Sequence, residues 1–213
     1  MKMYSYVVCK DTGFAPNPFW GYCTLAACTP NHMGIRPQIG DWLIGTESID
    51  KGNKLIYAMQ ISLIMPFDKY YTDKRFKMKI PVVKSENWRQ HCGDNIYYKD
   101  KSDKWQQHPS LFHNNPENKR QDIKHPSVFI SKCFYYFGCK AMKIPSKYDS
   151  LVWKRQGVKC NHIPNVCEDF LTWLQTNFKK GIHGKPRDCW SNSEKCSTTA
   201  SLHWKKLAPV CLA

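Results

Sequence analysis

The sequence has no long hydrophobic run, and no stretch approaches the length of about 18 apolar residues that crosses a bilayer. This absence argues against a transmembrane protein and against a membrane partner. Residues 1–6 contain no apolar segment of the secretory type. The eleven cysteines are odd in number, and none of them is part of a Cys-x-x-Cys pair. These features predict a cytoplasmic protein with free thiols rather than a secreted, disulfide-stapled one.

Two phosphate-binding fingerprints are also missing. The sequence contains neither Gly-x-x-x-x-Gly-Lys-[Ser/Thr] nor Gly-x-Gly-x-x-Gly, which excludes the P-loop and dinucleotide-binding classes. Structural zinc sites favour cysteine pairs separated by about two to four residues. Cys160, His162 and Cys167 come nearest to a ligand set, but their spacing is wider, and buried inert thiols are the more common alternative. We therefore expect no metal and no cofactor.

Acidic residues are scarce. The chain has 17 Asp and Glu against 32 Lys and Arg, which gives a formal net charge of +15. Such a charge attracts polyanions whatever the fold. The basic residues are scattered, with no run of five or more, which favours a folded basic face over a disordered tail. At 213 residues and 42% hydrophobic composition, the chain can bury a sizeable core.

Apolar and aromatic runs predict several strands and few helices. We expect strands at 4–9 and 128–138, a hairpin of 42–46 with 54–65, and a short helical or irregular crossover at 66–76. The order of these elements favours an α+β fold built on a curled sheet. We expect one domain over residues 1–213.

Two further segments have a distinct composition. Apolar residues repeat at helical spacing between 166 and 178, which predicts a helix there. Asn165 with Glu168 resembles a capping box, and residues 179–181 form a basic last turn that ends at a glycine. The segment at about 84–126 is polar and rich in Asn, His, Lys and Pro, so we expect an insertion that is the least ordered part of the chain.

The segment 11–26 is the most informative one. Its Gly and Pro residues exclude a helix, and its aromatic residues distinguish it from a disordered linker. We expect a rigid loop that carries Asp11, Asn17, Cys23 and Thr24, as a recognition pocket requires. The alternative is an Ω-loop whose polar side chains cap only their own backbone.

Nucleophilic catalysis is a further possibility. Cys23 or Cys28 could be activated by a histidine, with His32, His91 and His183 as candidates. A cysteine in an apolar run is more often part of the core. The basic turn 180–187 could place His183 and Arg187 on a phosphate or a base edge, although a plain turn after a helix is the alternative.

Two family resemblances follow from ordered motifs. The segment 40–45, then a polar turn, 55–59 and 67–68 resemble the core of PUA-like modules, especially EVE and ASCH domains. That resemblance implies a small curled β-barrel that holds a nucleotide or a modified base.

A closer resemblance spans most of the chain. It rests on seven motifs in order, at 11–19, 21–26, 40–42, 57–59, 93–97, 131–138 and 181–184. Together they resemble the Nucleotide modification associated domain 2 family. The resemblance implies a role in DNA-base modification and phage-conflict systems rather than a particular reaction. Members carry basic residues after the Cys-Thr-Leu-Ala segment, and in this chain Arg36 is the position where that implies a phosphate contact.

The leading hypothesis is a nucleotide- or modified-base-binding protein. Its polar pocket residues would be Asp11, Asn17, Thr24, Asp94, Asn95, Ser131 and His183, with Trp20 or Tyr136 stacking on the base. A reader of nucleic acid and a sensor of free nucleotides would share this pocket, and a basic groove long enough for a strand would distinguish them.

Two alternatives remain open. The chain could be an enzyme acting on a nucleobase or nucleotide, with Asp11 or Asp94 as general base, Cys23 as nucleophile and His183 as acid/base partner. It could also be a partner-binding defence or counter-defence protein without a small ligand, which a large exposed apolar patch would favour.

Overall fold

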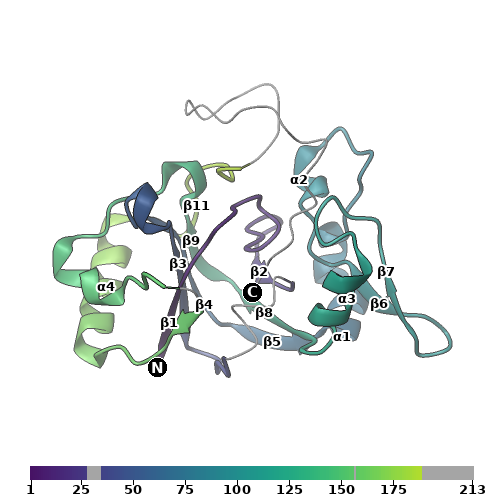
Figure 1. Cartoon of the computed structure of the whole chain (residues 1–213), viewed down its shortest axis with the longest axis horizontal. Coiled ribbons are helices and arrows are strands. Elements are labelled where there is room, and N and C mark those ends of the chain that lie inside the picture. The colour runs from purple at the N-terminus through teal and green to yellow at the C-terminus, as the bar shows by residue number, and fades with distance from the viewer. Residues whose placement is uncertain (28–34, 156, 189–213) are drawn as a thin grey trace.

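The computed structural model describes residues 1–27, 35–155 and 157–188 (Figure 1). Its largest sheet has six strands in the order β10-β1-β3-β4-β9-β11. The bounds of these strands are β1 Met3–Val7, β3 Trp42–Thr46, β4 Leu55–Gln60, β9 Cys133–Tyr136, β10 Val158–Lys159 and β11 Gly181–Ile182. Strands β1 and β3 are parallel, as are β9 and β11, whereas β4 is antiparallel to both of its neighbours.

A three-stranded sheet has the order β2-β8-β5, and a two-stranded sheet pairs β6 with β7. Their bounds are β2 Cys23–Leu25, β5 Leu63–Pro66, β6 Tyr97–Lys99, β7 Trp105–Gln107 and β8 Ser127–Ser131. The helices are α1 Phe67–Thr72, α2 Trp88–His91, α3 Pro116–Asp122 and α4 Pro164–Asn177, with 3-10 turns η2 Ile49–Lys51, η3 Lys74–Lys79, η4 Gly138–Lys140 and η5 Ser146–Leu151. The expected mixed α+β fold with few helices is confirmed.

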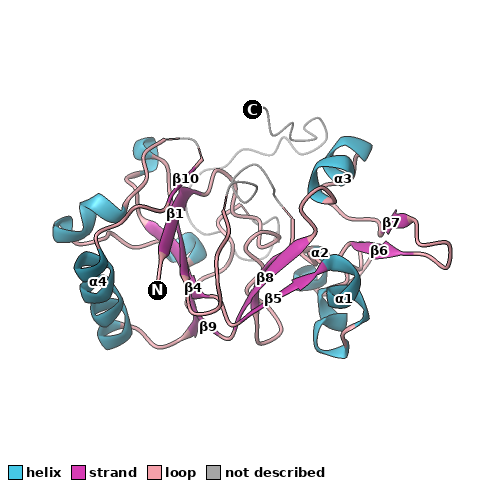
Figure 2. Ribbon diagram, turned by 90° about the horizontal axis from the view of Figure 1, so that it is seen from below, coloured by secondary structure: helices cyan, strands magenta, loops and turns pink. Residues whose placement is uncertain are grey.

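Two strand pairs connect the larger sheets. Only Ile61 and Ser62 separate β4 from β5, and only Lys132 separates β8 from β9. Because β4 pairs with β9 and β5 pairs with β8, the two long strands bend together and pass from one sheet to the next. Figure 2 shows β8 and β5 side by side beyond this bend, with α1 close to them. No closed barrel forms within the part of the chain that the structure describes.

The predicted strands are present, but the runs 54–65 and 128–138 each form two strands that belong to different sheets. The expected hairpin is β3 with β4, and the expected crossover contains α1 and η3. The run 128–138 forms two strands in two sheets rather than one strand. Ser131 and Lys132 make the corner, since the Ser131 hydroxyl donates to the carbonyl oxygen of Cys133 at 2.8 Å and accepts from its N–H at 3.1 Å.

Helix α4 covers one face of the six-stranded sheet (Figure 1). It buries Cys167, Phe170, Leu171 and Leu174, which recur at the spacing of one helical face. Full burial of a side chain such as Phe170 contributes about 1.5–3 kcal/mol. The expected capping box is wrong: Ile163 is the N-cap without a side-chain bond, and Pro164 opens the helix.

The expectation of little order in residues 84–126 is also wrong, because this segment contains α2, β6, β7 and α3. Its interior centres on buried Asp122, which accepts a hydrogen bond from the Tyr97 hydroxyl at 2.7 Å and contacts His113 Nδ1 at 2.6 Å. These polar residues form hydrogen bonds with one another inside the fold. A polar composition therefore did not indicate disorder in this segment.

The cysteines mostly match the sequence expectation. Within the described ranges, Cys9, Cys23, Cys92, Cys133, Cys160 and Cys167 are free thiols. Cys139 is disulfide-bonded, so the expectation of free thiols is wrong at that position. Cys28 and His32, two of the candidates for catalysis, lie outside the described residues. In the described part of the chain, no helix has the length and apolar character needed to span a membrane.

Candidate functional site

The loop predicted to be rigid is closed on itself by backbone pairing. Asn17 and Thr24 each donate an N–H to the other's carbonyl oxygen, both at 2.9 Å. Trp20 and Gly21 turn the chain between them with φ angles of 62° and 80°. The peptide bond between Ala15 and Pro16 is cis. The loop leads directly into β2, so its conformation sets where that strand begins.

Lys79, at the end of η3, clamps this loop from inside. It is fully buried, and its Nζ donates to the Asn17 carbonyl oxygen at 3.0 Å, to Asn17 Oδ1 at 2.8 Å and to the Tyr22 carbonyl oxygen at 3.0 Å. Burial lowers the pKa of Lys79 to about 8, against the opposing influence of Asp94 and Cys23. A lysine in a polar, 3-10-forming stretch carries no sequence signal of burial, so sequence reasoning missed it.

Asp94 lies beside Lys79 in the same interior. Its carboxylate accepts hydrogen bonds from the Thr24 hydroxyl at 2.6 Å and from the Tyr70 hydroxyl at 2.7 Å. Burial raises the pKa of Asp94, and the charge of Lys79 opposes that shift. The structure therefore brings Asn17, Thr24 and Asp94 together as expected, but around a buried lysine and with their polar atoms occupied by one another.

Asp11 forms a second buried node. Its carboxylate accepts hydrogen bonds from the Tyr136 hydroxyl at 2.5 Å and from the Arg187 N–H at 3.0 Å. Its own N–H donates to Asp188 Oδ2 at 2.8 Å, and its carbonyl oxygen accepts from the Asp188 N–H at 2.8 Å. Burial raises the pKa of Asp11 to about 6. Asp11 thus fixes the segment after β11 against the start of the loop.

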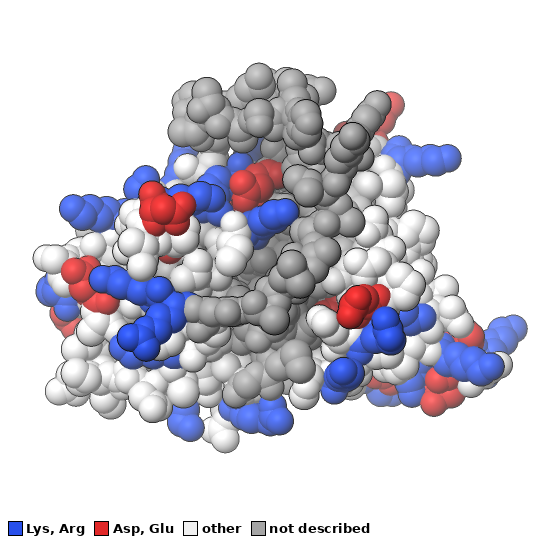
Figure 3. All heavy atoms as spheres, in the orientation of Figure 1, with Lys and Arg blue, Asp and Glu red and all other residues white. Residues whose placement is uncertain are grey.

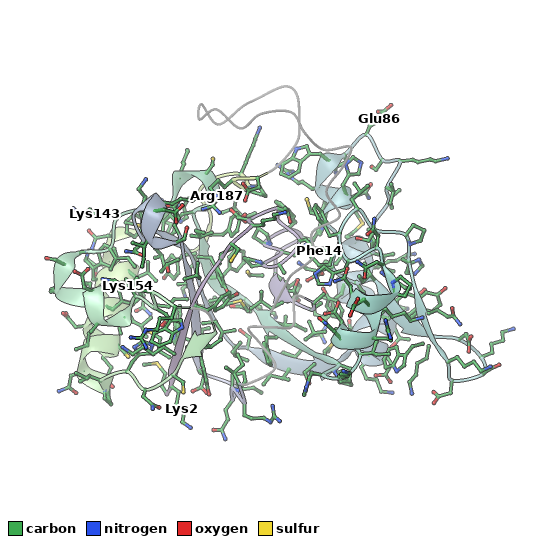
Figure 4. The ribbon with its side chains drawn as sticks, viewed as in Figure 1. Lys2, Phe14, Glu86, Lys143, Lys154 and Arg187 are labelled. Carbon is green, nitrogen blue, oxygen red and sulfur yellow. The ribbon has the colours of Figure 1, made fainter. Side chains whose placement is uncertain are left out.

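The close approach of Pro186 to the loop explains why residue 13 is a glycine. A Cβ on Gly13 would lie 2.6 Å from Pro186 Cγ, and its φ is +77°. Arg187 then reaches toward the end of β3, where its guanidinium donates to Glu47 Oε1 at 3.2 Å. Figure 4 shows Arg187 near the end of β11 and Phe14 on the side of the loop that faces α3.

Three further predicted residues are structural in their contacts. Cys23 is fully buried, pairs across the sheet with Ser131, and has its pKa raised by burial, which disfavours the thiolate. Ser131 holds the corner between β8 and β9. The Asn95 side chain donates to the carbonyl oxygens of Tyr70 and Phe76 at 3.2 and 3.3 Å, and so fixes α1 against η3.

His183 lies apart from these residues. It stacks on Phe137 with ring centroids 4.9 Å apart, and its Nε2 lies 2.7 Å from the Lys179 carbonyl oxygen. Phe137 belongs to the core under α4, whereas Tyr136 packs in the core on the opposite face of the sheet. His183 therefore lies on the other side of the sheet from Asp11 and cannot complete a site with it.

The two predicted stacking residues differ in exposure. Tyr136 is fully buried and its hydroxyl is occupied by Asp11. Trp20 is half-buried, and its indole nitrogen is buried without a hydrogen-bond partner in the structure. In place of an open polar pocket, these predicted residues form an interior framework.

An open pocket lies at the other end of β2 and β8. Its volume is about 310 Å³, near the lower limit for ligand pockets of roughly 300 Å³. We name it the Arg36 pocket; its lining residues are Ala26, Ala27, Ile35, Arg36, Pro37, Ile64, Lys124, His125, Pro126, Ser127 and Phe129. Arg36 and Lys124 are exposed, while Ile35, Ala26 and Phe129 are buried. The pocket thus combines an apolar wall with cations, which suits a ligand with an apolar face and an anionic group.

Other site chemistries find less support. Among the residues that the structure describes, no three His, Cys, Asp or Glu side chains gather where they could hold a metal ion. On the face shown in Figure 3, Lys and Arg occur in separate groups with Asp and Glu between them, rather than as one continuous basic field. On this face a specific anion contact would therefore depend on local geometry rather than on a broad basic surface.

Comparison with known proteins gave one match. No curated protein and no solved structure matches the chain. The model of the Nucleotide modification associated domain 2 family matches residues 1–194, which include the loop, both buried nodes and the Arg36 pocket. The family ties the chain to nucleotide modification as a theme. The chain belongs to the Nucleotide modification associated domain 2 family.

Proposed function

We propose that this protein binds a nucleotide or a modified base in the Arg36 pocket, and that this binding is part of nucleic-acid modification or phage defence. The observation that carries the proposal is the composition of the pocket, in which Arg36, Lys124 and His125 meet an apolar wall. A nucleotide has the matching character, with a planar base and an anionic phosphate.

The cations and the apolar wall of the pocket would contact different parts of a nucleotide. Arg36 Nη1 donates to the Ile35 carbonyl oxygen at 3.3 Å, and the exposed, planar guanidinium offers further N–H donors to a phosphate. Ile64 and Phe129 offer apolar surface to the face of a base, and Ser127 offers a hydroxyl for an edge.

The interior framework of predicted polar residues supports the Arg36 pocket indirectly. Lys79 and Asp94 hold Asn17 and Thr24, and Thr24 precedes Leu25 and the two alanines of the pocket wall. The predicted polar residues would then act as positioning residues for β2 rather than as ligand contacts. Their substitution would change the pocket's shape and the stability of the fold together.

We further propose that the fold is a variant of the PUA-like architecture. The bends from β4 into β5 and from β8 into β9 curl the sheet around the loop, as an open barrel would. The pocket residues Ile35, Ile64 and Phe129 pack in the core that also contains side chains of β1, β3 and β4, so the pocket borders the interior of the curl.

Native mass spectrometry of the purified protein tests the binding function, followed by titration with the four deoxynucleoside 5′-monophosphates. We expect a retained or titratable nucleotide whose binding weakens by roughly ten- to 150-fold in Arg36→Ala, because a charge-assisted contact contributes about 1.5–3 kcal/mol. Arg155→Ala is the matched control, since it removes an exposed arginine that is not among the lining residues of the Arg36 pocket. Equal affinity in both variants would contradict the assignment of the pocket.

An enzyme acting on nucleotides is the second candidate, favoured by the edge where β1, β3, β9 and β11 end. Asp11, Glu47 and Arg187 meet there, and Glu47 Oε2 and Arg187 Nε are buried without hydrogen-bond partners. A carboxyl whose pKa is raised to about 6 suits general acid–base chemistry. Turnover of a bound nucleotide that disappears in Asp11→Asn, with binding retained, would select this candidate.

A further inference from the structure

We propose that the ligand of the Arg36 pocket is one nucleotide of a single strand, and that the backbone of that strand continues over α3. This inference rests on the proposed function. A second hollow of about 330 Å³ lies next to the first and is lined by Glu117, Arg120, Gln121, Ile123 and Lys124. Lys124 lines both hollows, so the two are adjacent.

The two hollows together carry more cationic side chains than the phosphate of one nucleotide would contact. Arg36 and Lys124 lie in the first hollow, and Arg120 lies in the second. All three side chains are exposed. No ion pair links Arg120 or Lys124 to a carboxylate among the described residues, and Glu117 is the only acid in either lining. A phosphate of the next nucleotide would meet Arg120 and share Lys124 with its neighbour.

Helix α3 is held by contacts on its inner side, with Arg120 exposed on the helix and exposed Lys124 two residues beyond its end. On its inner side, Asp122 contacts His113 and Tyr97, and the Lys119 ammonium donates to the Trp105 carbonyl oxygen at 2.5 Å. At its start, the Asn115 side chain accepts the Asn118 N–H at 2.7 Å. Because these contacts fix the rotation of the helix, the backbone that carries Arg120 does not have to be ordered at the moment of binding.

The apolar wall distinguishes a single strand from a duplex. Ile64 and Phe129 can contact the face of a base only if that base is unstacked. In a duplex each base is stacked on both faces, and removing it from the stack costs a few kcal/mol. A single strand presents unstacked bases together with a continuous run of phosphates, which matches an apolar wall beside a row of cations.

Fluorescence anisotropy with a labelled single-stranded oligodeoxynucleotide of about ten nucleotides tests the proposal, alongside titration with deoxynucleoside 5′-monophosphates. Arg120→Gln should weaken binding of the strand roughly three- to tenfold and lower the slope of log K against log salt by about 0.7, the value for one lost phosphate contact. Arg120→Gln should leave mononucleotide binding unchanged, whereas Arg36→Ala should weaken both. Arg155→Gln should change neither.

The possible results separate the two proposals. If mononucleotides bind through Arg36 but Arg120→Gln weakens the strand no more than Arg155→Gln does, the strand inference is overturned and the proposed function stands. If neither a mononucleotide nor the strand binds, both fall. Tighter binding of a duplex of the same sequence would overturn the choice of a single strand.

Discussion

The Lys79 ammonium lies 2.8 Å from the side-chain oxygen of Asn17, although the two residues are 62 positions apart in the sequence. Both side chains are fully buried. The same ammonium also donates to two backbone oxygens of the loop, so all three of its N–H groups are used. A buried lysine with three acceptors acts here as a rigid joint between η3 and the loop that precedes β2.

Replacing Lys79 with methionine should therefore destabilise the protein strongly. Methionine fills a similar volume but removes the donor to the Tyr22 carbonyl oxygen and one donor from each of the two Asn17 oxygens. It also removes the cation near Asp94, and together these losses should cost roughly 3 kcal/mol. Urea unfolding followed by circular dichroism measures the free energy of unfolding. Lys77→Met is the matched control on the same turn, because Lys77 is exposed and its substitution should change stability by less than about 0.5 kcal/mol. Equal midpoints for the two variants would contradict the role assigned to Lys79.

Asp11 gives the stability a pH dependence of known sign. Burial raises its pKa from the ordinary value of 3.8 to about 6. Between about pH 4 and pH 6 the native protein holds this proton while the unfolded chain has released it. The contribution of Asp11 to stability is therefore present at low pH and is lost as the pH rises through 6.

The variant Asp11→Asn cannot titrate at this position, so it isolates the effect. The free energy of unfolding of the wild type minus that of Asp11→Asn should fall by up to about 3 kcal/mol between pH 4 and pH 7, and change little above pH 7. Denaturant unfolding at several pH values provides the measurement, with the exposed Glu86→Gln as control. A difference that is constant, or that increases with pH, would show that Asp11 is charged throughout this range.

The sequence predicted the parts of the fold whose signals are local. Strands β3 and β4 follow from apolar runs on either side of a polar turn, and α4 follows from the spacing of Phe170 and Leu174. The corner at Ser131 and Lys132 was not predicted, because a strand that changes sheets keeps its β-forming composition. The packing around Asp122 was missed for a related reason: buried polar groups that pair with Tyr97 and His113 resemble surface residues in the sequence.

The candidate site was predictable only in part. The motifs indicated that Asn17, Thr24 and Asp94 belong together, and the structure places them in one network. Composition could not show that these polar atoms satisfy one another rather than face a ligand, since that depends on Lys79. It also could not show on which face of the sheet His183 lies, because a strand as short as β11 has no clear alternation. The Arg36 pocket forms where β5, β8, the end of β2 and the segment between α3 and β8 meet, which no local sequence pattern records.

The last prediction concerns Cys23, the candidate nucleophile. Its thiol is fully buried and its pKa is raised, so Cys23→Ala should cost on the order of 1 kcal/mol of stability and leave nucleotide binding at the Arg36 pocket unchanged. In the native protein, iodoacetamide should modify the exposed Cys9 and Cys160 well before Cys23, with peptide mass spectrometry following each site. Rapid native-state labelling of Cys23, together with loss of nucleotide turnover in a Cys23→Ala variant of undiminished stability, would replace the binding function with a cysteine-dependent reaction.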